Sequence, residues 1–246
     1  MKHLLYALFA LALLLTAGRA SSSSTEAPMV GNLTLTRFYY SIQGSMMPRS
    51  WEITYLEDGY RIRENDGTAR PFPEALAAEL TQVIADNGAD SWQGVYETEY
   101  EVLDGEGFSL TLDFANGKRV QASGENAFPD LYFSFQRAVL DIFQRDKMAF
   151  LAGTYQYKDE GTGSDFILTL NADGSYILHE GASSGDAGTG TWDVYDNAVY
   201  LNEGEGSSDR SLMFGVEENT LIYLAAGSDS SGDFKLQDGA CFIKQT

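Results

Sequence analysis

Three glutamates alternate along one segment of the chain, which is the pattern with which paired carboxylates could do chemistry. Glu97, Glu99 and Glu101 lie in the expected strand 95–103, so they share one face at a spacing of about 6.8 Å. Like charges at this spacing can raise the pKa of one carboxyl, as acid–base catalysis requires. Two further interpretations stay open: cation binding, and cross-strand pairing with the arginines of segment 61–63. We favour the pairing and treat the three glutamates only as weak carboxylate candidates.

Nucleophilic catalysis finds little support in the sequence. After the expected export signal the chain keeps one histidine, His179, and no Gly-x-Ser-x-Gly motif accompanies it. The single cysteine, Cys241, lies in an apolar stretch, where we expect a buried and inert thiol without an activating base. We therefore assign no catalytic residue and no cofactor-binding residue, and we expect a protein that is not an enzyme.

Two acidic loops are the candidates for calcium. Asp159, Glu160 and Asp165 flank a Gly/Thr/Ser loop, and Asp229 and Asp233 flank a second loop. Neither loop has the twelve-residue ligand spacing with a distal glutamate that calcium-binding loops use. We interpret both as polar turns, so we assign no metal site and expect at most weak calcium binding.

Aromatic residues supply the remaining candidate surface. Tyr39, Tyr40, Trp92 and Tyr96 could together form a binding surface, because tyrosine and tryptophan are enriched in binding hot spots and in sugar-binding platforms. Packing in the core is the competing explanation for these residues. The partner of such a surface would be a protein or a glycan.

The N-terminus indicates export. A basic start precedes Leu4–Leu15, an apolar run of twelve residues that is too short to span a bilayer. Small residues at Gly18 and Ala20 place cleavage after residue 20, and 21–29 has the composition of a flexible tether. No cysteine lies directly after the apolar run, at the expected cleavage site, so we expect a soluble secreted or extracytoplasmic protein without a lipid anchor and without membrane insertion after cleavage.

Residues 30–149 mix strand and helix patterns, which predicts an α+β domain. Asp58-Gly59 and Asn116-Gly117 are signals for tight hairpin turns. A first helix is expected after Pro73, and a second is expected after the Phe128-Pro129-Asp130 segment.

Residues 150–246 show strands only, with turn signals such as Asp173-Gly174 and Glu218-Asn219 at short intervals. We predict a small antiparallel β-barrel, because closure removes the unpaired strand edges of such a meander. Alternation assigns these residues to its interior: Phe166, Leu168, Leu170, Tyr176, Leu178, Trp192, Val194, Leu212, Phe214, Leu221 and Tyr223.

The second part resembles a known group of small barrels. Its segments Gly153-Thr154-Tyr155, 168–176 and Gly190-Thr191-Trp192 are similar to lipocalin-like barrels of bacterial envelope and secreted proteins. These include the copper-resistance and envelope-stress lipoproteins, whose anchoring cysteine and Cys-x-x-Cys motif this chain lacks. In the first part, 104–108 and 124–129 are similar to uncharacterised segments of secreted bacterial proteins, a resemblance that implies no activity.

Composition narrows the function further. The formal charge is −20, which argues against nucleic-acid binding through a general electrostatic footprint. We expect a secreted, non-catalytic binding protein whose partner the sequence does not name. The first alternative is a carrier of a small apolar ligand inside the barrel, and the second is a carboxylate-dependent hydrolase.

Overall fold

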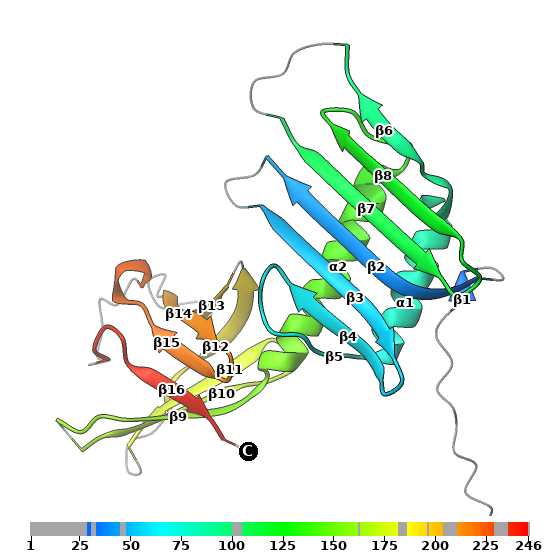
Figure 1. The fold of residues 1–246 in the computed structure, drawn as a ribbon. Coiled ribbons are helices and arrows are strands. Elements are labelled where there is room, and N and C mark those ends of the chain that lie inside the picture. The colour runs from blue at the N-terminus through cyan, green and yellow to red at the C-terminus, as the bar shows by residue number, and fades with distance from the viewer. Residues whose placement is uncertain are drawn as a thin grey trace, which may run out of the picture.

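The computed structural model describes residues 29–30, 33–44, 48–99, 105–161, 163–181, 186–195, 197–203, 211–228 and 236–245. A mixed sheet with two α-helices comes first along the chain, and a closed barrel follows it (Figure 1). The predicted fold class, α+β followed by a small antiparallel barrel, is confirmed. The expected signal peptide and almost all of the tether lie outside the described residues.

The first part is built on an eight-stranded sheet. Its strands are β1 (Met29–Val30), β2 (Leu33–Gln43), β3 (Arg49–Leu56), β4 (Gly59–Glu64), β5 (Arg70–Phe72), β6 (Gly94–Glu97), β7 (Gly107–Phe114) and β8 (Arg119–Glu125). The order is β5-β4-β3-β2-β7-β8-β6, with β1 paired to β2, and only the pairing of β6 with β8 is parallel among the described strands. Gly59 and Gly117 take the positive φ that the two tight hairpins require.

Both described α-helices, α1 (Glu74–Asp86) and α2 (Tyr132–Leu151), lie on one face of this sheet (Figure 1). A short 3₁₀ helix, η1 (Ala89–Ser91), follows α1. Pro73 immediately precedes α1 at φ −62°, the backbone angle that suits a helix start. The core between helices and sheet is rich in rings. Tyr40 packs on Phe135 and Trp51, and Trp51 packs on Phe143.

In the described part of the second half, eight strands close into an antiparallel barrel. They are β9 (Gly153–Lys158), β10 (Asp165–Leu170), β11 (Ser175–Glu180), β12 (Asp186–Tyr195), β13 (Ala198–Glu203), β14 (Ser211–Glu217), β15 (Thr220–Tyr223) and β16 (Cys241–Lys244), with a 3₁₀ helix, η2 (Ala225–Gly227), after β15. Closure is completed by the pairing of β16 with β9.

All of the residues that alternation assigned to the barrel interior are buried there, so that prediction is confirmed. The interior also holds Leu151, Tyr155, Val199, Leu201, Val216, Ala240 and Phe242. These are mostly bulky side chains, and in a barrel of eight strands such side chains suffice to fill the interior.

The two hydrophobic cores meet at α2. Val139 and Ile142 belong to the core under the sheet, whereas Leu151 at the end of the same helix belongs to the barrel core. The predicted boundary between residues 149 and 150 falls in the last turn of this helix, and the division into domains stays a prediction. No helix in the described part of the chain is both long and apolar enough to cross a membrane.

The expectation of a buried cysteine is wrong. Cys241 is exposed, and so is its second neighbour Ile243, while Phe242 between them fills the barrel interior. Successive side chains of a strand point to opposite faces, so an apolar run along β16 places only every second residue inside.

We therefore expect Cys241 to react completely with Ellman's reagent in the folded protein, because its thiol faces solvent. The measurement is the absorbance of the released thiolate, with and without denaturant. A thiol that reacts only after unfolding would contradict the exposed position.

Candidate functional site

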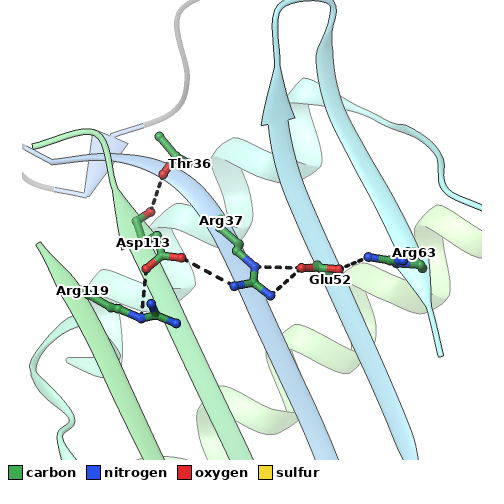
Figure 2. A network of polar contacts seen from close by, with 6 residues as sticks. All are labelled: Thr36, Arg37, Glu52, Arg63, Asp113 and Arg119. Carbon is green, nitrogen blue, oxygen red and sulfur yellow. Dashed lines mark hydrogen bonds and ion pairs between the residues drawn. The ribbon is translucent and has the colours of Figure 1, made fainter. Parts of the chain in front are cut away.

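The sheet face opposite the helices is open, since no described helix covers it (Figure 1). At the end of this face where β2 begins, charged side chains form a network (Figure 2). Arg37 donates to Glu52 over 2.8 Å and lies 3.8 Å from Asp113, and Arg119 contacts Asp113 over 3.3 Å. Arg63 donates to the second carboxylate oxygen of Glu52.

These charges satisfy one another. Partial burial opposes ionisation of Glu52, but the hydrogen bonds from Arg63 and Arg37 outweigh it and lower its pKa. Glu52 therefore stays ionised at neutral pH. The carboxylates at this end of the open face are already paired with arginines, so they are not available to a ligand.

The favoured pairing with the arginines of β4 is wrong for the described glutamates, Glu97 and Glu99. Strand β6, which carries Glu97, lies at one edge of the sheet, and β4 lies near the opposite edge. Arg61 pairs with Asp58 at its own hairpin, and Arg63 pairs with Glu52. Pairing depends on strand order, which the spacing along the chain does not determine. Glu99 is exposed just after β6, and Glu101 lies outside the described residues.

At the edge with β6, the open face holds a pocket of about 520 Å³, which we call the sheet pocket. Strand register places Glu97 directly beside Glu125 of β8, and Ser109 of β7 beside Ser123 of β8. Its complete lining is Gln43, Val95, Tyr96, Glu97, Thr98, Phe108, Ser109, Ser123, Gly124, Glu125 and Asn126.

Two glycine-containing segments, 104–108 and 124–129, meet at this pocket through their described residues. Register pairs Gly107 with Glu125, and the Asn126 N–H donates to the Glu106 carbonyl over 2.9 Å. The sequence showed these segments as motifs without an activity. The fold makes them two neighbouring walls of one pocket.

The glycines of these segments are needed for the close approach of the walls. A Cβ on Gly105 would lie 1.7 Å from the Asn126 side-chain oxygen, and one on Gly124 would lie 2.2 Å from the Ala127 carbonyl. Asn126 itself has φ +58°, a left-handed conformation that asparagine tolerates better than most residues. Glycine at position 105 therefore leaves the space that the side-chain amide of Asn126 occupies.

Five polar side chains of the sheet pocket have no partners within the described residues. Gln43, Glu97, Ser109, Ser123 and Glu125 make no side-chain hydrogen bond or ion pair there. This is the opposite of the situation at Glu52 and Asp113. Two acceptor carboxylates, an amide and two hydroxyls are thus free to bind a ligand.

A row of serines crosses the open face and leads into this pocket. Ser50, Ser41, Ser109 and Ser123 are register neighbours on β3, β2, β7 and β8. Ser41 is only 5% exposed, and its hydroxyl has no hydrogen-bond partner. A buried hydroxyl without a partner is uncommon, and it marks this face as polar and incompletely satisfied.

The expected aromatic surface is corrected for two of its four members. Tyr40 and Trp92 are buried in the core under the sheet. Tyr39 and Tyr40 are adjacent on β2, so their side chains point to opposite faces and only Tyr39 reaches the open face. Tyr96 is half-buried, lines the sheet pocket, and packs against Phe108.

Sequence reasoning missed a buried polar cluster behind the pocket. The hydroxyls of Tyr40 and Tyr132 lie 3.0 Å apart, and Gln136 donates to Glu106 over 2.5 Å and to Tyr132 over 3.3 Å. Burial raises the pKa of Tyr132 to about 12 and raises that of Tyr40 further, so both stay protonated. The cluster joins α2 to β2 and to the segment before β7. These residues are far apart in sequence, and no local pattern links them.

The calcium candidates form no cage in the described residues. Asp159 is buried, and one of its carboxylate oxygens accepts the Gly161 N–H over 2.8 Å, as in an Asx turn. Asp165 lies at the start of β10, and Asp229 and Asp233 lie outside the described residues. Within those residues, no group of three or more His, Cys, Asp or Glu side chains could hold a metal ion.

Comparison with known protein families, curated proteins and solved structures finds no match to this chain. What the structure shows at the level of class is an α+β sheet part followed by a closed eight-stranded antiparallel barrel in the described residues, an architecture consistent with a lipocalin-like barrel. The functional assignment must come from the site itself.

Proposed function

We propose that this chain is a secreted, non-catalytic binding protein that holds a hydroxyl-rich ligand, a saccharide, in the sheet pocket. The main support for this proposal is that Glu97 and Glu125 lie side by side and that neither side chain has a partner in the described residues. Carboxylates accept strong charge-assisted hydrogen bonds, and sugar hydroxyls are donors that can supply them. Secretion rests on the N-terminal export pattern of the sequence.

The polarity of the open face favours a saccharide over a protein partner. The core of a protein interface is usually depleted in charge and enriched in aromatic residues. Here the tyrosine and tryptophan that could have provided such a core, Tyr40 and Trp92, are buried. Val95, which is 69% exposed, supplies an apolar contact at the rim for the C–H face of a sugar ring.

The two alternatives draw unequal support. An apolar carrier needs space inside the barrel, and the interior positions there are occupied by bulky side chains. A hydrolase would use Glu97 and Glu125 as its two catalytic carboxylates, because these residues are direct neighbours on β6 and β8. Because the hydrolase would use the same pair, one experiment separates the two functions.

The test begins with a glycan array, and the saccharide that binds is then titrated by calorimetry. Converting both glutamates to glutamine (E97Q/E125Q) keeps their shape and removes their charge, and we expect binding about tenfold weaker or worse. The matched control is Gln121→Ala. Gln121 is an exposed residue of β8, the strand that carries Glu125, and it does not line the pocket. Undiminished binding by the double variant would refute the site, and release of cleaved sugar would replace the binding function by the hydrolase.

A further inference from the structure

A second pocket lies where the sheet part meets the barrel, and we call it the junction pocket. Its volume is about 570 Å³. The loop between β4 and β5 and the last turn of α2 form one side, with Thr68 and Phe150 among the lining residues. The barrel provides Asn197, Val216 and the Glu218-Asn219 turn on the other side. A volume in this range suits a small organic molecule.

The junction pocket combines an apolar floor with a polar rim. Leu151 and Val216, which belong to the buried barrel core, are its apolar lining residues together with Phe150. Phe150 is 37% exposed, and the Arg70 guanidinium lies 4.7 Å from the centre of its ring. Apolar contact combined with a few convergent polar groups is the usual composition of a small-molecule site.

Most charges of this pocket are already neutralised. Lys147 contacts Glu64 over 2.9 Å, and Arg70 donates to the buried carboxylate of Asp146. Glu218 differs from them, since its carboxylate makes no hydrogen bond or ion pair within the described residues. Among the described residues that line the pocket, Glu218 is therefore the only charged side chain without a partner, and it is available to a ligand.

The backbone holds Glu218 at this position at some cost. Its φ is +52°, a left-handed conformation that is unfavourable for a glutamate. In the two-residue turn between β14 and β15, glycine, asparagine or aspartate would take this position with less strain. Strain of this kind is concentrated at ligand sites, and here it coincides with the unpaired charge of the pocket.

From these observations we propose that the junction pocket binds a small amphipathic amine. The ammonium group lies against the Glu218 carboxylate, and the apolar body covers Leu151, Val216 and Phe150. An anion of the same shape would meet the unpaired Glu218 carboxylate, while the lining cations Lys147 and Arg70 are already paired with Glu64 and Asp146. This site is separate from the sheet pocket and does not depend on a saccharide ligand.

Three probes that differ in one group test the assignment: 2-phenylethylamine, 2-phenylethanol and 3-phenylpropionate. We expect the amine to bind most tightly and the carboxylate most weakly, with amide shifts in NMR spectra at Leu151 and Val216. Glu218→Gln should weaken the amine about fivefold, the effect of one exposed ion pair, and should leave the alcohol unchanged.

Glu217→Gln is the matched control, because it removes the neighbouring exposed charge, which does not line the pocket. It should leave the affinity of all three probes unchanged. The proposal is overturned if no probe shifts the junction residues, if the carboxylate binds best, or if both glutamine variants change amine affinity equally. Because Glu217 and Glu218 are exposed, both variants should keep the wild-type melting temperature.

Discussion

Replacing Trp192 with alanine is expected to lower the free energy of unfolding by about 3–5 kcal/mol, the usual cost of removing a large aromatic side chain from a core. Trp192 is only 2% exposed and lies among the interior residues of the barrel. Its indole N–H donates to the Asn171 carbonyl over 2.8 Å, and its backbone N–H donates to the Gly174 carbonyl over 2.7 Å. The side chain therefore anchors β12 to the β10–β11 turn.

The loss is measured by urea unfolding of the full chain, followed by circular dichroism. Thr191→Ala is the control, since the adjacent side chain is exposed on the outer face of the same strand and should cost less than about 0.5 kcal/mol. A loss for Trp192→Ala below about 1 kcal/mol would show that the barrel does not depend on this residue.

The second large effect is expected at the ion pair between Arg70 and Asp146. Asp146 is 2% exposed, and Arg70 of β5 is its cationic partner. Arg70→Met keeps an apolar stem but leaves a buried carboxylate without a counter-charge, so we expect a loss of about 3–5 kcal/mol at pH 7.

This loss should depend on pH in a defined direction. Burial raises the pKa of Asp146, although the hydrogen bond and charge of Arg70 oppose the shift, and Glu64 adds a smaller repulsion. The Asp146 carboxyl therefore keeps its proton to a higher pH in the folded state than in the unfolded state. The contribution of Asp146 to stability falls as the pH rises above 3.8, the ordinary pKa of an aspartate. Removing Arg70 raises the folded pKa further, so the penalty of Arg70→Met should be smaller near pH 4 than at pH 7.

Arg145→Met provides the comparison on the same helix. Arg145 pairs with Glu79 and Asp141, but all three side chains are substantially exposed, so the loss should stay below about 1 kcal/mol. Urea unfolding of both variants at pH 4, 5.5 and 7 distinguishes the two cases. Equal losses, or a penalty for Arg70→Met that does not change with pH, would contradict a buried pair.

Features encoded by neighbouring residues could be predicted from the sequence. The hairpins at Asp58-Gly59 and Asn116-Gly117 need positive φ at one residue, and the helix after Pro73 needs a fixed φ at its start. The barrel interior follows from strict alternation along strands whose other face meets water. Each of these signals acts within a few residues, so it survives without knowledge of the tertiary fold.

Features that depend on strand order could not be predicted. The predicted pairing of Glu97 with Arg63 is wrong because four strands separate β4 from β6 in the sheet. These strands are β3, β2, β7 and β8. The sheet pocket unites Glu97 with Glu125 only through a parallel pairing between β6 and β8. The segments 104–108 and 124–129 could have indicated this site, because isolated glycines in a strand pattern often mark a close backbone approach. The structure shows such an approach at Gly105 and Gly124.

The edge position of β6 has a consequence for self-association. The barrel leaves no strand edge open among its described strands, but β6 ends the sheet and has β8 as its only described partner. Exposed Val95 on such an edge would template pairing with strands of other molecules. Glu97 and Glu99 oppose such pairing, because two β6 edges that approach each other bring these like charges together. Salt or acid weakens this repulsion. Glu97 therefore both lines the sheet pocket and contributes to the charge that opposes pairing at this edge.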